Sequence, residues 1–155
     1  MSEFLTELVI RCSEGCENIW ILDEPLLYKS DLLTDPLSSS SMSGVIVIPA
    51  GFRTDLASTR HIPLVSMIWG DTAHREAVVH DYLYCIDSDP IVSFSMANAV
   101  FIEAMESRDK SIFVRYPMWW GVWIGGYPHY HSHKVDWRPG DDPPICVDPN
   151  TVIQP

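Results

Sequence analysis

The stretch HREAVVHDYLYC, residues 74–85, has the apolar spacing of a helix but carries a histidine and an aspartate in its middle. It predicts a helix over about residues 72–85, with Glu76 in the first turns, where the helix dipole favours an acid. One stripe of this helix, spaced i, i+3, i+4 and i+7, contains Ala77, His80, Asp81 and Tyr84. Packing alone would choose apolar residues there. His80 and Asp81 therefore either take part in chemistry or form a buried polar cluster.

A second apolar stripe predicts a helix over about residues 91–107, after a break at Pro90. The stripe consists of Phe94, Ala97, Phe101, Ala104 and Met105. Asn98 lies inside it, so each helix carries a polar residue within an apolar face, and we expect the two to meet. Two interpretations stay open. Either His80 is a general base held by an acceptor on the second helix, or His80 and Asn98 satisfy each other as an interhelical clamp. The residue types favour the clamp.

The N-terminal region has the features of short strands, which we predict at residues 4–11, 19–28 and 45–49. A serine-rich loop, residues 35–44, precedes the last of them. After the helical pair, the segment YPMWWGVWIGG predicts a short third helix with Pro117 in its first turn and two glycines, Gly125 and Gly126, at its end.

Together these elements predict a single α+β domain over residues 1–137, in which a small N-terminal β region packs on the helical pair. Residues 138–155 contain five prolines. They are expected to form an extended arm that gains order from a partner, because proline density precludes regular structure.

Composition limits the function. The chain has 155 residues, 46% of them hydrophobic, which is enough for a packed core. Its net charge of −11 argues against nucleic-acid binding, which needs lysine and arginine to displace counterions, and against docking on anionic membranes. No apolar run approaches the roughly 18 residues of a membrane span, and the first residues lack the pattern of a signal peptide. We expect no membrane insertion and synthesis in a cytoplasm, where the four cysteines are most simply free thiols.

Two further groups of polar residues are candidate metal ligands. Asp55 follows a strand and a glycine-containing turn, and with Asp81 it could form a weak calcium site; a carboxylate that caps its own loop is the favoured interpretation. The second group has alternate spacing, His129, His131 and His133. On an extended strand the three imidazoles would face one way, as a zinc site requires, but no fourth ligand is evident and we expect solvated histidines instead.

Three tryptophans, Trp119, Trp120 and Trp123, cover more than one face of the third predicted helix. Adjacent indoles cannot both point into a core. At least one is therefore expected in an interface, since tryptophan is enriched at binding hot spots.

Three ordered motifs, VIPAGFRTDLAST, AVVHDYLY and ANAVFIEAM, resemble domain-of-unknown-function family 1353, which occurs in bacteriophages and prophages. The resemblance runs from about Val45 to Trp123. It implies a phage protein. The expectation is a structural protein of the virion or tail, made in the bacterial cytoplasm, with other phage structural proteins as partners and homo-oligomerisation as an option.

The helical pair is also similar to that of secreted phospholipases of the A-two type. That resemblance implies His80 as base, Asp81 as calcium ligand and position 98 as the carboxylate that orients the histidine. Here position 98 is Asn, and the glycine-rich calcium loop and the disulfides of those enzymes are missing. We therefore expect no cofactor and no activity. The alternative is a His-based hydrolase, phospholipase-like or acting on a cell-envelope substrate, that uses His80 with Asp81 or Asp55 and for which calcium is an option.

Overall fold

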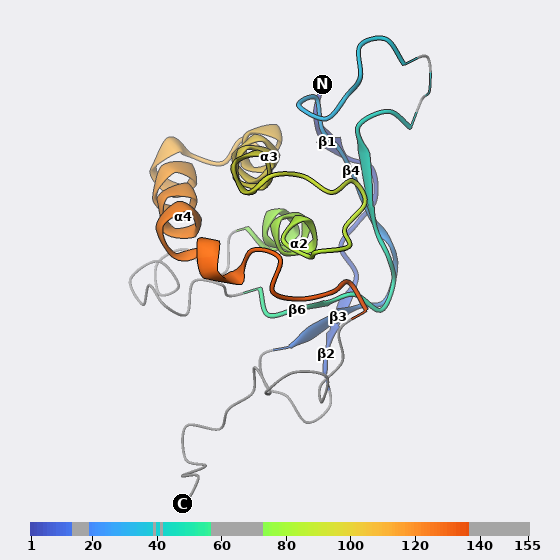
Figure 1. Cartoon of the computed structure of the whole chain (residues 1–155), viewed down its shortest axis with the longest axis vertical. Coiled ribbons are helices and arrows are strands. Elements are labelled where there is room, and N and C mark those ends of the chain that lie inside the picture. The colour runs from blue at the N-terminus through green and yellow to red at the C-terminus, as the bar shows by residue number, and fades with distance from the viewer. Residues whose placement is uncertain (14–18, 39, 41, 57–72, 137–155) are drawn as a thin grey trace, which may run out of the picture.

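The computed structural model of the chain describes residues 1–13, 19–38, 40, 42–56 and 73–136. Within them, short antiparallel strands come first and three helices follow, so the predicted α+β class is confirmed. Figure 1 shows the strands along one side of the molecule and the helices on the other. The predicted arm, residues 138–155, lies outside the described residues.

The strands are β1 (Glu3–Phe4), β2 (Ile10–Cys12), β3 (Trp20–Leu22), β4 (Leu26–Lys29), β5 (Val45–Ile48) and β6 (Arg53–Thr54). They form two three-stranded antiparallel sheets, ordered β1-β4-β5 and β2-β3-β6. Each sheet takes one strand from each of three chain segments, residues 3–12, 20–29 and 45–54. The residue pairing between neighbouring segments continues from one sheet into the other without a shift. The two sheets are therefore the halves of a single bent meander.

The meander bends between β3 and β4, so the strand predicted over 19–28 is interrupted. Pro25 lies at the bend and has no N–H to give to a ladder. The Thr6 hydroxyl fills the gap, because it donates to the Pro25 carbonyl at 3.1 Å and accepts from the Leu27 N–H at 2.9 Å. This bridge lets the register pass through the bend.

The helices are α2 (His74–Leu83), α3 (Phe94–Ser107) and α4 (Ile112–Gly125), and a short 3₁₀ helix, η2 (Tyr127–His129), follows. Ser93 and Ser111 begin α3 and α4 as N-caps. The expectation that Pro117 lies in the first turn of the third helix is wrong. The Ser111 side chain accepts from the Phe113 N–H, and this cap starts the helix earlier than a proline-based start predicts.

The core lies around α2, which is packed between the β1-β4-β5 sheet and α3 (Figure 1). The inward side chains of the sheet, Leu26, Tyr28, Ile46 and Ile48, have no exposed surface. They meet the apolar side of the helices, formed by Val78, Val79, Leu83, Val100 and Ala104. Each buried aliphatic side chain of this size contributes about 1.5–3 kcal/mol, which makes this contact the main source of stability.

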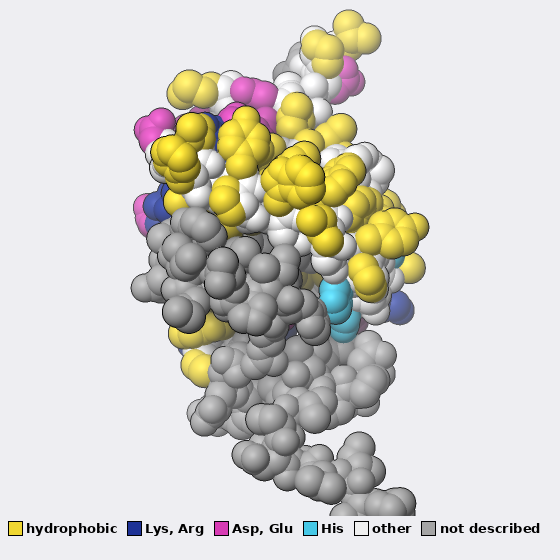
Figure 2. Space-filling model, turned by 90° about the vertical axis from the view of Figure 1, so that its left-hand side faces the viewer, with side chains coloured by type: hydrophobic (Ala, Val, Ile, Leu, Met, Phe, Trp, Pro, Cys, Tyr) yellow, Lys and Arg dark blue, Asp and Glu magenta, His cyan; other side chains and the backbone are white. Residues whose placement is uncertain are grey.

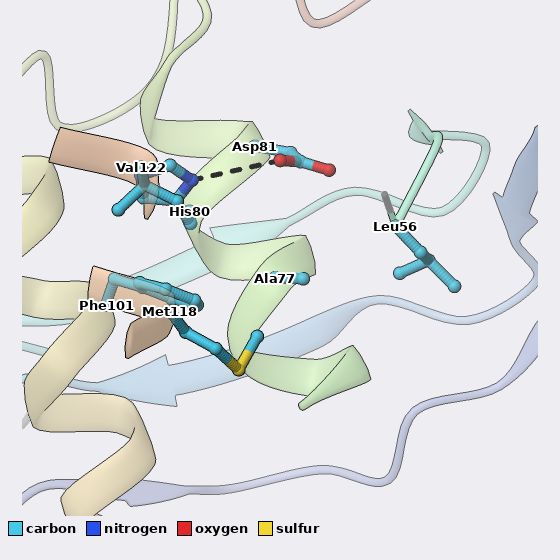
Figure 3. A pocket seen from close by; sticks show the side chains of 7 residues that line it. All are labelled: Leu56, Ala77, His80, Asp81, Phe101, Met118 and Val122. Atoms are coloured by element: carbon cyan, nitrogen blue, oxygen red, sulfur yellow. Dashed lines mark ion pairs between the residues drawn. The ribbon is translucent and has the colours of Figure 1, made fainter. Parts of the chain in front are cut away.

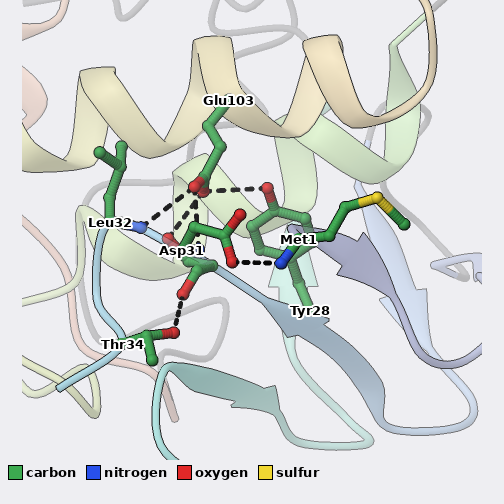
Figure 4. A network of polar contacts seen from close by, with 7 residues as sticks. Met1, Tyr28, Asp31, Leu32, Thr34 and Glu103 are labelled. Atoms are coloured by element: carbon green, nitrogen blue, oxygen red, sulfur yellow. Dashed lines mark hydrogen bonds and ion pairs between the residues drawn. The ribbon is translucent and has the colours of Figure 1, made fainter. Parts of the chain in front are cut away.

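A carboxylate on α3 joins the helices to the sheet (Figure 4). Glu103 Oε2 accepts from the Tyr28 hydroxyl at 3.0 Å and the Ser30 hydroxyl at 2.7 Å. Its Oε1 accepts from the backbone N–H groups of Asp31 at 2.9 Å and Leu32 at 3.1 Å. Burial, reinforced by the charge of Glu103, raises the pKa of Tyr28, so the phenol stays a donor. The four donors fix the end of β4 against α3.

The segment after α4 folds back onto the C-terminal end of α2. The His131 N–H donates to the Tyr84 carbonyl at 2.8 Å, and the Ile86 N–H donates to the His133 carbonyl at 2.9 Å. The Tyr130 hydroxyl donates to the Val92 carbonyl at 2.5 Å.

No helix within the described residues combines the length and apolar character needed to cross a bilayer.

Candidate functional site

His80 and Asn98 meet in the core between α2 and α3, as their positions in the two stripes predict. His80 Nε2 lies 2.9 Å from Asn98 Oδ1, and the Tyr84 hydroxyl donates to the same oxygen at 2.9 Å. His80 is 2% exposed and Asn98 is fully buried. The imidazole lies against the rings of Tyr84 and Phe101, with centroid distances of 4.0 and 4.8 Å. Burial raises the pKa of Tyr84, which therefore remains protonated and keeps its donor role.

This geometry sets the tautomer of His80. An amide oxygen only accepts, so the hydrogen between the two residues belongs to Nε2. The lone pair of the neutral imidazole is then on Nδ1, on the other side of the ring. Nδ1 lies 3.9 Å from Asp81 Oδ1, beyond hydrogen-bond distance. His80 thus has one nitrogen engaged by Asn98 and one basic nitrogen that faces Asp81.

A small pocket of about 20 Å³ lies beside the imidazole (Figure 3). Its lining, besides His80 and Asp81, is apolar and comes from the segment after β6 and from α2, α3 and α4: Leu56, Ala77, Phe101, Met118 and Val122. A water molecule needs at least about 10–15 Å³ of such space. The pocket accordingly has room for a water beside Nδ1, but not for the reacting part of an ester.

Asp81 is held by Thr54 at the end of β6. The Thr54 hydroxyl donates to Asp81 Oδ2 at 2.5 Å and accepts from the Leu56 N–H at 3.1 Å. Asp55, the residue chosen from the sequence as a possible partner of Asp81, is partly exposed, and the bond that reaches Asp81 from this segment comes from its neighbour instead. The Asp81 carboxylate therefore ties the meander to α2.

The histidines proposed as metal ligands do not lie on an extended strand. His129 ends η2, and the chain turns at His131, which has a positive φ of 58°. The His131 ring stacks on Tyr130 at 3.8 Å, whereas His133 Nδ1 lies 2.6 Å from the Ser132 hydroxyl. In the part of the chain that the structure describes, no three His, Cys, Asp or Glu side chains are grouped as a metal site would need.

Glu76 is a second buried acid, one helical turn before His80. Its side chain has no exposed surface, and neither carboxylate oxygen accepts a hydrogen bond from the described residues. Arg108 Nη1 is 3.9 Å from Oε2. Burial raises the pKa of the Glu76 carboxyl, and its own backbone N–H and the charges of Arg108, Lys110 and Arg75 offset part of this rise. Glu76 was predicted as a first-turn acid, and its burial is a property of the tertiary packing.

The outer side of α4 and the first residue of η2 form an exposed apolar surface, here called the aromatic face. Its members are Ile112, Phe113, Tyr116, Trp120, Trp123, Ile124 and Tyr127, each between 41% and 76% exposed. Figure 2 shows hydrophobic side chains gathered on the side of the molecule that carries α4. Of the three tryptophans singled out from the sequence, Trp120 and Trp123 belong to this face. Trp119 is partly buried and stacks on Trp123 at 5.5 Å.

Several residues of these sites were not predicted from the sequence. Tyr84 was placed on the right stripe but given no role, although its spacing of one turn from His80 puts both donors on one acceptor. The contact of Thr54 with Asp81 was not predicted. Phe113 lies before the start of the predicted third helix, and Tyr116 is its first residue but received no role.

The family model described as protein of unknown function (DUF1353) matches residues 21–122. This range contains the meander from β3 onward and most of the three helices, and with them His80, Asp81, Asn98 and Glu103. No curated protein and no solved structure matches the chain.

Proposed function

The chain belongs to the DUF1353 family, and we propose that this member is a non-catalytic structural protein of a bacteriophage virion or tail. Its polar cluster holds the helices together, and its contacts with other subunits are made at the surface. The phage association rests on the resemblance of the three sequence motifs. The enclosure of His80 supports the structural role.

The enclosure of the His80 imidazole is the observation that best supports this proposal. A general base must reach a water that itself contacts the substrate, yet the imidazole is 2% exposed and its pocket has room for little more than one water. The residue that would support an imidazolium is the neutral Asn98. In serine proteases, a comparable aspartate-to-asparagine change beside the catalytic histidine lowers turnover about ten-thousand-fold. A cluster with these features stabilises a fold better than it catalyses a reaction.

The test is to replace His80 by Ala and to measure both unfolding in urea and hydrolysis of a short-chain phospholipid ester with calcium present. We expect the free energy of unfolding to fall by about 1–3 kcal/mol, because Asn98 loses its buried partner. We expect wild type and variant to show the same background hydrolysis. A stable variant that loses a measurable wild-type activity would contradict the structural role.

A hydrolase is the second candidate, and one observation favours it. His80 Nδ1 lies on the side of Asp81, and both residues line the pocket, so a water placed there would lie beside an imidazole and a carboxylate. Asn98→Asp tests this candidate. If the cluster is catalytic, the new carboxylate supports the imidazolium and hydrolysis rises; if it is structural, the buried charge lowers stability and no hydrolysis appears.

The place in a virion has its own test. Mass spectrometry of purified phage particles should detect the chain in a fixed stoichiometric ratio to the known tail or capsid subunits. Its absence from particles that form in its presence would exclude a virion role without bearing on the enclosure of His80.

A further inference from the structure

We propose that the aromatic face of α4 is the contact between two copies of this chain, packed antiparallel about a two-fold axis near Trp120. The inference rests on the proposed role as an interaction protein, and it names the partner. The helix α4 has two apolar sides. Met118 and Val122 point into the core, whereas the aromatic face lies on the opposite side within about a third of the helix circumference.

The spacing along this face fits another helix. Phe113, Tyr116, Trp120, Trp123 and Tyr127 alternate steps of three and four residues, the pattern of a helix that packs along its length on a second helix. Tyr127 continues the row because Gly126 has right-handed helical geometry, with φ −80° and ψ −25°.

The face is also self-complementary in one orientation. Tyr116 and Ile124 are equally far from Trp120, and so are Phe113 and Tyr127. An antiparallel second copy therefore brings a large apolar side chain opposite each of these residues, with Trp120 facing its own equivalent. This matches the isologous contact of a symmetric dimer, in which residue i meets j and j meets i.

The area is large enough for a stable dimer. With 41–76% of each of seven large side chains exposed, and about 150–250 Å² for a whole aromatic side chain, the face presents on the order of 800 Å². Standard interfaces bury about that much on each partner, whereas the largest apolar patch of a monomer is about 300–600 Å².

Charge does not oppose this contact locally. Arg115 is the only charged residue of α4, and its Nη1 lies 2.5 Å from Glu106 Oε1. The chain's net charge of −11 is therefore carried elsewhere. The same net charge makes an anionic bilayer an unfavourable occupant of the face.

The first experiment is sedimentation equilibrium of the full chain over a range of micromolar concentrations. We expect a species of twice the chain mass of 17.6 kDa. Trp120→Glu should raise the dissociation constant by at least about 30-fold, because it places two carboxylates at the centre of the contact. Leu37→Glu, in a loop far from α4 and 93% exposed, is the matched control and should leave the dimer intact.

The second experiment tests the orientation with Tyr116→Lys and Ile124→Glu. Each variant alone should be monomeric, because its new charge faces an apolar residue of the second copy. An equimolar mixture should form a heterodimer, since in the antiparallel arrangement the new lysine meets the new glutamate. All three face residues are exposed, so far-ultraviolet circular dichroism should be unchanged in each variant.

A monomeric wild type would overturn the proposal. If that monomer binds phosphatidylcholine vesicles through Trp120, the occupant is lipid; if it does not, the occupant is a different protein. A dimer that Trp120→Glu leaves unaffected would overturn it as well. None of these results bears on the stability and hydrolysis assays of the His80 variant, so failure of the dimer and failure of the structural role can be told apart.

Discussion

Glu103 and Glu76 are both acids on the packed helices, but their surroundings differ. Glu103 receives four hydrogen bonds from β4 and the residues that follow it. Glu76 is completely buried and accepts no hydrogen bond from the described residues, and Arg108 Nη1 lies 3.9 Å from its Oε2. The difference shows that burial alone does not decide whether a carboxylate stabilises a fold. The number of donors aimed at it does.

Replacing Glu103 by Ala should produce the largest effect. The change leaves the Tyr28 and Ser30 hydroxyls without their acceptor, and buried unpaired groups cost about 1–3 kcal/mol each, whereas the N–H groups of the exposed Asp31 and Leu32 turn to water. We expect the free energy of unfolding in urea to fall by about 3–5 kcal/mol. Glu106→Ala on the same helix is the control. Its ion pair with Arg115 is half exposed, so a loss under about 1 kcal/mol is expected. Equal losses in the two variants would mean that the network around Glu103 contributes nothing beyond surface charge.

Replacing Glu76 by Met should act in the opposite direction and depend on pH. Burial raises the pKa of the Glu76 carboxyl in the fold. Below its ordinary pKa of 4.5 the carboxyl is protonated in both the folded and the unfolded chain, so it costs the fold nothing. As pH rises from there through the folded pKa, the unfolded chain gives up its proton more readily and the free energy of unfolding falls. The apolar variant escapes this loss. We expect it to be more stable than wild type by about 1–2 kcal/mol at pH 8 and to approach wild type in acid. Urea titrations at several pH values measure the difference, and a variant that is less stable at pH 8 would show that Arg108 compensates the buried charge.

The Tyr84→Phe variant should have the smallest effect, because it removes only one of two donors from a shared acceptor. Asn98 Oδ1 loses one of two donors and keeps His80 Nε2, so no buried group is left without a partner on that oxygen. We expect a loss of about 0.5–1.5 kcal/mol by thermal or urea unfolding. A loss as large as that of Glu103→Ala would mean that the two donors hold the amide cooperatively.

The sequence predicted those features that depend on local periodicity. Apolar stripes located α2 and α3, and the polar residues that interrupt them, His80 and Asn98, proved to be in contact. The helix α4 was predicted too short because Pro117 was taken as a start signal. The structure places it inside a helix that the Ser111 side chain caps.

Features that depend on distant parts of the chain were not predictable in this way. The sequence does not indicate that Glu103 would meet residues more than 70 positions earlier, or that Glu76 would be enclosed rather than solvated in a first turn. The bend of the meander depends on the Thr6 side chain, which looks like any strand residue until its partner Pro25 is opposite it. Sheet-to-helix packing decides all three.

The contact between Glu103 and β4 also has a consequence for the order of folding during synthesis. The meander emerges from the ribosome first, with Leu26, Tyr28, Ile46 and Ile48 uncovered, and the acid that satisfies Tyr28 and Ser30 follows 75 and 73 residues later. Until the helices cover this face, its apolar side chains stay in contact with water, which opposes a stable fold. We therefore expect no stable intermediate until α3 has left the exit tunnel of the ribosome. Nascent chains arrested before that point should bind a ribosome-associated chaperone. After release they should be protected from protease in a single step.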